Sequence, residues 1–234
     1  MQVKDFHGMS KLIIAIDGPS GAGKSTLSKL LAQRLGYIHL DTGAMYRCVA
    51  LAARQKGIDP GAQERLGTLA QQLRIEFVPT PAGDLVFLDG EDVSSAIRTP
   101  EVSLLTSKIS AAPQVRAALV ALQRHLGEAG GVVLEGRDIG TVVFPQAQVK
   151  FFLSATAEER GRRRYDELVA RGGKVVLQRT ISEVVARDAA DSAREHAPLL
   201  QAEDAVVIDS TKLSIDEVLA TMISIVQARR QEPC

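Results

Sequence analysis

Apolar residues gather in short runs that alternate with longer amphipathic stretches along the chain. The run "LIIAI" at 12–16 is rich in β-branched residues and is typical of a buried strand. The stretch "TLSKLLAQRLG" at 26–36 then spaces its leucines as a helix does and ends at a glycine. The pattern therefore opens with a buried strand followed by a helix.

The same alternation continues to the carboxyl end. The short run "YIHL" (37–40) predicts a strand, and three buried strands are predicted at "GVVLEG" (131–136), "VKFFL" (149–153) and "AVVID" (205–209). Helical patterns occupy 113–129 and 214–230. Strands that alternate with helices predict an α/β fold whose parallel sheet is flanked by helices.

Two segments depart from this rhythm. Residues 73–97 alternate with period two around Pro79, Pro81, Gly83 and Asp89-Gly90, which predicts an inserted antiparallel sheet of three short strands. Residues 154–173 predict a helix that is polar nearly all round.

This polar helix has clear end signals. Thr156 and Glu159 have the spacing of a capping box, and Gly172-Gly173 ends the pattern. Gly161 is unfavourable inside a helix by about 1 kcal/mol relative to alanine and is consistent with a segment that moves.

Composition narrows the class of protein. The 234 residues include 28 Lys+Arg and 28 Asp+Glu, so no global field attracts nucleic acid or a membrane. Two cysteines without metal spacing fit a reducing cytoplasm. No apolar run approaches the ~20 residues of a membrane span, and we expect a disordered leader at 1–10.

The first strand and helix enclose a phosphate-binding motif. "IDGPSGAGKST" (16–26) fits G-x-x-x-x-G-K-[ST], whose backbone N–H groups surround phosphate oxygens. Lys24, expected to be exposed in the loop, reaches the outer phosphates, and the Ser25 hydroxyl suits Mg²⁺. The candidate phosphate-binding residues are Gly18, Pro19, Ser20, Gly21, Ala22, Gly23, Lys24, Ser25 and Thr26. The alternative is a glycine-rich turn that binds nothing.

Two further stretches are predicted at the same edge of the sheet. In "LDTGAMYR" (40–47), Asp41 or Thr42 caps a helix, whereas Tyr46 and Arg47 suit a nucleotide.

In "LEGRDIGTVVFP" (134–145), Glu135 is placed like an acid that holds Mg²⁺, and Arg137 suits a phosphate. The alternative is that Glu135 and Arg137 only pair with each other.

Two groups of arginines could either bind a ligand or form ordinary ion pairs with neighbouring acids. Arg160, Arg163 and Arg164 share one face of the polar helix, where they either stabilise a transferring phosphoryl group or pair with nearby acids. Arg187, Asp191 and Arg194 form one helical stripe in "ARDAADSAREHAPL" (186–199). Its charged side chains either pair only with one another, as an Arg–Asp–Arg ladder, or form a site that hydrogen-bonds a sugar or base.

The chain resembles bacterial cytidylate kinases over essentially residues 11–230. The resemblance rests on six motifs in this order: "IDGPSGAGKST", "LDTGAMYR", "EGRDIGTVVFP", "ERGRRR", "RDAADSAR" and "DSTKLS". The resemblance implies a P-loop kinase fold with an inserted NMP-binding domain and a helical lid. It divides the chain into a core (11–41, 103–156, 174–231), an NMP-binding domain (42–102) and a lid (157–173).

The resemblance also implies that ATP·Mg²⁺ donates its γ-phosphoryl group to CMP or dCMP. We expect the protein to be a monomer. Arg160 and Arg164 would be the main lid clamps, with Arg163 close behind, while Arg47 and Arg137 would hold the acceptor phosphate. The residues implied around cytosine are Thr42, Ser107, Arg116, Asp138 and Arg194, with Arg187 and Asp191 toward the sugar. Thr42 replaces the serine associated with that position and keeps its hydroxyl.

Other functions remain open from the sequence. A P-loop kinase could accept AMP, UMP or shikimate instead, and a panel of acceptors separates these. A GTP-dependent switch needs [NT]-K-x-D, but Ser214 of "STKLS" stands where the aspartate belongs. A nucleotide-binding module without catalysis would not need the arginine-rich helix.

Overall fold

The computed structural model describes residues 11–80, 83–170 and 172–231. The predicted leader at 1–10, Pro81 of the predicted turn and Cys234 lie outside the described residues.

A five-stranded parallel sheet forms the centre of the molecule, in the order β2-β6-β1-β7-β8. All five strands had been predicted, and the structure confirms them. Because the strands are parallel, their carboxyl ends meet at one edge, as the sequence analysis required. The strands are β1 (Ile13–Asp17), β2 (Ile38–Asp41), β6 (Val132–Glu135), β7 (Val149–Ser154) and β8 (Val206–Asp209).

Helices pack on this sheet through buried aliphatic side chains. Helices α1 (Lys24–Leu35) and α8 (Ile215–Gln231) share an apolar cluster with one face, in which Leu31 and Met222 are fully buried beside Ile14. The alternate side chains of β1 and β6 point into a separate cluster with Ile139 and Val143. The sheet is therefore covered on both faces, and only its edges and the ends of its strands are free to carry a site.

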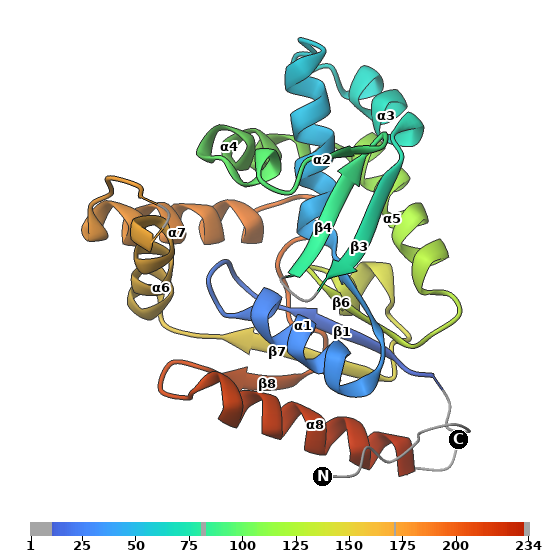
Figure 1. Cartoon of the computed structure of the whole chain (residues 1–234), viewed down its shortest axis with the longest axis vertical. Coiled ribbons are helices and arrows are strands. Elements are labelled where there is room, and N and C mark those ends of the chain that lie inside the picture. Colours follow the sequence, from blue (N-terminus) through green and yellow to red (C-terminus); the bar gives the residue numbers. More distant parts are fainter. Residues whose placement is uncertain (1–10, 81–82, 171, 232–234) are drawn as a thin grey trace.

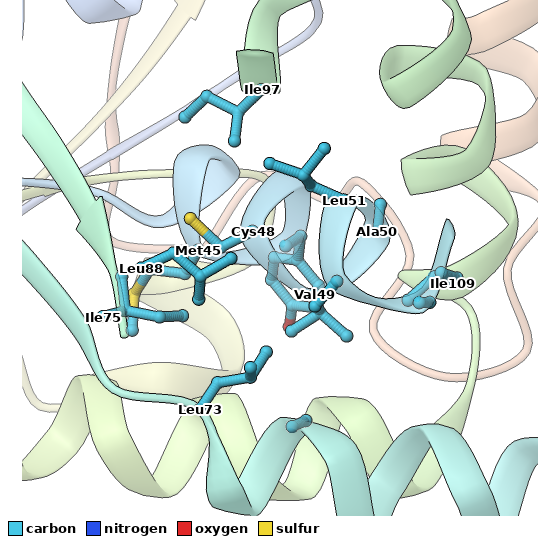
Figure 2. Packing of buried hydrophobic residues seen from close by; sticks show 14 of the residues in the cluster. Met45, Cys48, Val49, Ala50, Leu51, Leu73, Ile75, Leu88, Ile97 and Ile109 are labelled. Atoms are coloured by element: carbon cyan, nitrogen blue, oxygen red, sulfur yellow. The ribbon is translucent and has the colours of Figure 1, made fainter. Parts of the chain in front are cut away.

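The inserted segment forms its own core above the sheet (Figure 1). Its antiparallel sheet of three strands is confirmed, although β5 has only two residues. Figure 2 shows Met45, Cys48 and Val49 of α2 surrounded by apolar residues from this sheet and from other segments of the insert. The elements are α2 (Thr42–Gln55), α3 (Gln63–Gln72), β3 (Ile75–Thr80), β4 (Gly83–Leu88), β5 (Glu91–Asp92), a 3-10 helix (Ala96–Arg98), α4 (Pro100–Ile109) and α5 (Pro113–Gly127).

The apolar cluster of the insert continues beyond residue 102. Ile109, Val115 and Leu119 of α4 and α5 belong to the same cluster as α2. The two helices thus join the insert through packing, although the division of the chain at 102 and 103 stays a prediction.

The predicted polar helix is α6 (Ala157–Ala170), which packs on α7 (Leu177–Ser192) (Figure 1). Only half of the expected capping box forms: Glu159 N donates to Thr156 Oγ1 at 3.3 Å, while Thr156 N donates to Thr211 Oγ1. Gly161 has a packing role, because a Cβ there would lie 2.4 Å from Ile181 Cγ1. Close approach of the two helices explains this glycine. That the segment moves stays a prediction.

In the part of the chain that the structure describes, no helix is long and apolar enough to cross a membrane. Cys48 is buried as a free thiol in the core of the insert, and burial raises its pKa to about 12.

Candidate active site

The carboxyl edge of the sheet opens into a cavity of about 840 Å³. Its walls come from the phosphate loop, α2, α4, α6, α7, the turn after β6 and the loop before α8. The sequence motifs, which lie far apart along the chain, therefore meet in one place.

The phosphate loop has the backbone that its glycines predict. Gly18, Gly21 and Gly23 have φ of 145°, 78° and 90°, and a Cβ on Gly18 would lie 2.0 Å from the Leu153 carbonyl oxygen. Lys24 is only 6% exposed, so the expectation of an exposed lysine is wrong. Burial, with the nearby charge of Arg137, lowers the pKa of Lys24 to about 7. Its ammonium donates to the Pro19 carbonyl at 2.7 Å.

Next to Lys24, the proposed metal ligands lie together. Ser25 Oγ donates to Glu135 Oε2 at 2.8 Å, whereas buried Glu135 Oε1 has no hydrogen-bond partner among the described residues. Thr42 Oγ1 donates to the Glu135 carbonyl at 2.6 Å, which fixes the start of α2 against the end of β6.

His39 is a site residue that the sequence analysis missed. Its Nε2 lies 2.9 Å from Ser28 Oγ and 3.4 Å from Glu135 Oε1, and its Nδ1 lies 2.7 Å from Asp84 Oδ2. Burial alone would lower the pKa of His39, but Asp84 and Glu135 outweigh it and raise the pKa to about 9. The imidazolium therefore bridges two carboxylates under the cavity.

Asp17 was also missed. Its two carboxylate oxygens accept hydrogen bonds from Ile139 N at 2.8 Å and from Gly140 N at 2.7 Å. These bonds hold the π-helix Ile139–Val143, so the preceding turn presents Arg137 and Asp138 to the cavity. Burial raises the pKa of Asp17 to about 6, against the effect of its two N–H partners.

The predicted stripe of α7 forms only part of a ladder. Asp191 Oδ2 accepts from Arg137 Nε at 2.9 Å, and Asp191 Oδ1 accepts from Arg194, which lies just past the end of α7. The alternative in which Arg137 pairs with Glu135 is therefore wrong. Arg187 Nε is buried without a partner in the described part of the chain, and burial together with Arg137 lowers the pKa of Arg187 to about 10.

Arg47 faces the same region from α2. Asp41 is the N-cap of that helix, accepting from Ala44 N at 2.8 Å, and its other oxygen accepts from Arg47 at 2.7 Å. Arg98 of the insert also lines the cavity, and it was not predicted because no motif surrounds it and its charge alone is no signal.

Another part of the same cavity brings together an aromatic ring, a guanidinium and a carboxylate. Arg116 pairs with Asp138, and its guanidinium lies 5.9 Å from the centroid of the Tyr46 ring. Burial raises the pKa of Asp138 despite this pairing. The side of the cavity on α4 is lined by Ser103, Thr106 and Ser110. Ser107 is half-buried on the same helix but is not among the residues that line the cavity.

The three arginines of α6 have different surroundings. Arg163 and Arg164 line the cavity, where Arg163 donates to Ser210 and Glu159, and Arg164 donates to Glu167. Arg160 is buried outside the cavity lining. It donates to the Ala155 and Ser20 carbonyls and pairs with Asp188. Arg160 therefore anchors α6 to the phosphate loop in this structure, in contrast to its expected place as a leading clamp.

An apolar patch at the start of α8 completes the cavity. Leu213, Ile215 and Val218 line it beside the phosphate loop, with the first two substantially exposed. This patch was not predicted from the sequence, because its pattern matches the beginning of an ordinary amphipathic helix.

The parallel sheet, the phosphate loop and the cavity lined with arginines together define a P-loop nucleotide kinase. The comparisons with known proteins agree: the profile of the cytidylate kinase family matches residues 14–228. The chain therefore belongs to the cytidylate kinase family.

Named relatives are similar over almost the full length. The cytidylate kinase of Syntrophotalea carbinolica is 62% identical over 224 residues, which cover 96% of this chain and 95% of the relative. That of Geobacter sulfurreducens is also 62% identical, covering 96% of each chain. The crystal structure of an uncharacterized protein from Eubacterium ventriosum matches with a TM-score of 0.51 at 10% identity, covering 93% of this chain and 99% of that chain, which shows likeness of fold alone.

Proposed function

We propose that this protein transfers the γ-phosphoryl group of ATP to CMP or dCMP, giving ADP and the nucleoside diphosphate. The observation that carries the proposal is Arg187, a half-buried arginine that lines the cavity near Arg47 and Arg137 and whose buried Nε has no hydrogen-bond partner among the described residues. Like charges crowded at a buried site need an anion, and an acceptor phosphate supplies it.

The donor binds on the other side of the cavity. Backbone N–H groups of residues 20–26 and the ammonium of Lys24 hold its phosphates. The apolar patch of Leu213 and Ile215 gives the adenine ring a surface beside the loop. Donor and acceptor phosphates thus face each other between α1 and the turn after β6.

A magnesium ion fits the residues present. Glu135 Oε1 is buried and accepts no hydrogen bond among the described residues, with His39 Nε2 nearby at 3.4 Å, and Ser25 Oγ donates to the other oxygen of the same carboxylate. Mg²⁺ is commonly held by one or two carboxylates together with substrate phosphates. Ser25 and Glu135 would hold it, and the ion would neutralise charge on the donor phosphates.

The residues of the chain then act by positioning and by charge. The acceptor phosphate is already an anion, so transfer to it requires no general base. Arg47, Arg137 and Arg187 orient the acceptor phosphate. Arg163 and Arg164 meet the charge that spreads over the transferring group, so the two are proposed as catalytic residues with Lys24.

Base recognition falls to the pocket of Tyr46, Arg116 and Asp138. Cytosine offers a 4-amino donor where uracil offers a carbonyl, and a carboxylate accepts only from the former. Thr42, Asp191 and Arg194 support this pocket through the bonds described above, and a contact of Ser107 with the base stays a proposal from the family resemblance.

The test is ADP production by the purified protein with ATP, Mg²⁺ and each of CMP, dCMP, UMP and AMP. We expect CMP and dCMP to support turnover far better than AMP or UMP, and Lys24→Met to abolish it. Preference for AMP or UMP would overturn the acceptor assignment. Near-normal turnover by Lys24→Met would overturn the donor site.

A further inference from the structure

The contact between His39 and Asp84 joins the central sheet, which carries the proposed donor site, to the insert, which carries part of the proposed acceptor site. Asp84 lies near the tip of the hairpin formed by β3 and β4, and its carboxylate meets His39 of β2 at 2.7 Å. Figure 1 shows this hairpin reaching from the insert to the sheet beside α1. In this way the start of β4 is tied to β2, beside the proposed donor site.

The other ring nitrogen of His39 continues the connection. Nε2 lies 2.9 Å from Ser28 Oγ and 3.4 Å from Glu135 Oε1, and Ser28 Oγ in turn lies 3.3 Å from the Ser25 carbonyl oxygen. Ser28 is fully buried, and the His39 and Glu135 side chains are 11% and 5% exposed, so water competes little for these contacts. His39 therefore contacts one proposed metal ligand directly and the helical turn that carries the other.

We propose that His39 is a positioning residue, which orients the Glu135 carboxylate and couples the docking of the Asp84 hairpin to magnesium binding at the donor site. The proposal rests on the proposed function, since it takes Ser25 and Glu135 as the residues that hold the ion. Groups behind a metal ligand commonly change metal affinity by about 10-fold to 100-fold when they are removed.

The experiment measures ADP binding by titration calorimetry with Mg²⁺ and with EDTA. The ratio of the two affinities reports the magnesium contribution without turnover and without CMP. For His39→Asn we expect this ratio to fall on the order of 10-fold while the affinity in EDTA stays within about twofold of wild type. Asp84→Asn is expected to lower the same ratio by a smaller factor.

Two control variants exclude general effects. His125→Gln removes an exposed histidine of α5, whose side chain is 73% exposed, and Glu76→Gln removes a carboxylate from β3 of the same small sheet. Neither is expected to change the ratio. Thermal unfolding of each variant establishes that the folded protein is compared.

Several outcomes would overturn the inference. Equal losses of ADP affinity with and without Mg²⁺ in His39→Asn would show a merely structural role. An unchanged affinity ratio in Asp84→Asn would show that the hairpin is not coupled to magnesium binding. Additive losses of the ratio in the His39→Asn/Asp84→Asn double variant would show the same. These results do not depend on whether CMP is the acceptor, because the calorimetry contains no CMP. An error in the acceptor assignment would show only in the assay of ADP production with CMP.

Discussion

Asp138 is the residue whose charge is expected to decide between bases. Its carboxylate pairs with Arg116 in the pocket beside Tyr46. Replacing Asp138 by asparagine supplies an amide that can also donate to a carbonyl. We expect CMP activity to fall and the ratio of CMP to UMP activity to shrink, with kcat/KM measured for both substrates.

The contradicting outcome is a parallel loss. If Asp138→Asn lowers both values of kcat/KM and leaves their ratio within about twofold, the residue only holds Arg116 in place. A fully desolvated hydrogen-bond site can reject a wrong analogue by about 10⁴-fold, and a partly wet cavity by less.

Asp17 gives a pH dependence with a definite sign. Its pKa is raised from 3.8 to about 6 in the folded protein, so the folded state binds more protons than the unfolded state between these values. The contribution of Asp17 to the free energy of unfolding therefore declines as the pH rises from about 4 to about 6, and is constant above.

Denaturant unfolding of wild type and Asp17→Asn at several pH values measures this contribution. The wild-type free energy of unfolding minus that of Asp17→Asn should decrease over this interval. A difference that is flat or increases with pH would show that the two N–H partners, and not burial, control the carboxylate.

At the scale of elements, α6 carries arginines with separate tasks. Arg163 and Arg164 line the cavity, whereas Arg162 is 65% exposed and lies outside its lining. Alanine at position 163 or 164 should lower kcat, by up to about 10³-fold by analogy with arginine fingers, and change CMP binding little. Arg162→Ala is the matched control and should keep normal kcat.

Arg160→Ala is expected to behave differently from both. It removes a buried guanidinium with three partners, so the free energy of unfolding should fall together with activity. Unchanged kcat in Arg163→Ala, Arg164→Ala and their double variant would show that the arginines of α6 only pair with nearby acids on a solvated helix and take no part in catalysis.

Elements were more predictable from the sequence than contacts between them. The strands of the sheet were found because β-branched runs bounded by glycine and helical patterns leave few alternatives. The π-helix after β6 was not predicted, since its shape depends on Asp17, whose carboxylate meets it from more than 100 residues away. Local periodicity contains no information about such a contact.

At the scale of the whole molecule, the site residues that belong to recognisable sequence motifs were predicted correctly as neighbours. The phosphate loop, Glu135 and the arginines converge as expected, whereas His39 and Arg160 show the limit. The role of His39 depends on a partner 45 residues away, and that of Arg160 on α7 and the phosphate loop. Burial and pairing of a charged side chain are properties of the assembled fold.

The tight packing of Gly161 against Ile181 has a thermodynamic consequence. It joins α6, whose Arg163 and Arg164 are proposed to meet the donor, to α7, whose Arg187 is proposed to bind the acceptor; all three arginines line the cavity. We expect helices packed this closely to move as one body. A shift of the pair that either nucleotide favours would then also move the arginines proposed to bind the other nucleotide. Calorimetry should then show that CMP tightens ADP binding several-fold, and that ADP tightens CMP binding by the same factor, as linkage demands. Gly161→Ala, which forces the helices apart, should bring both factors toward one.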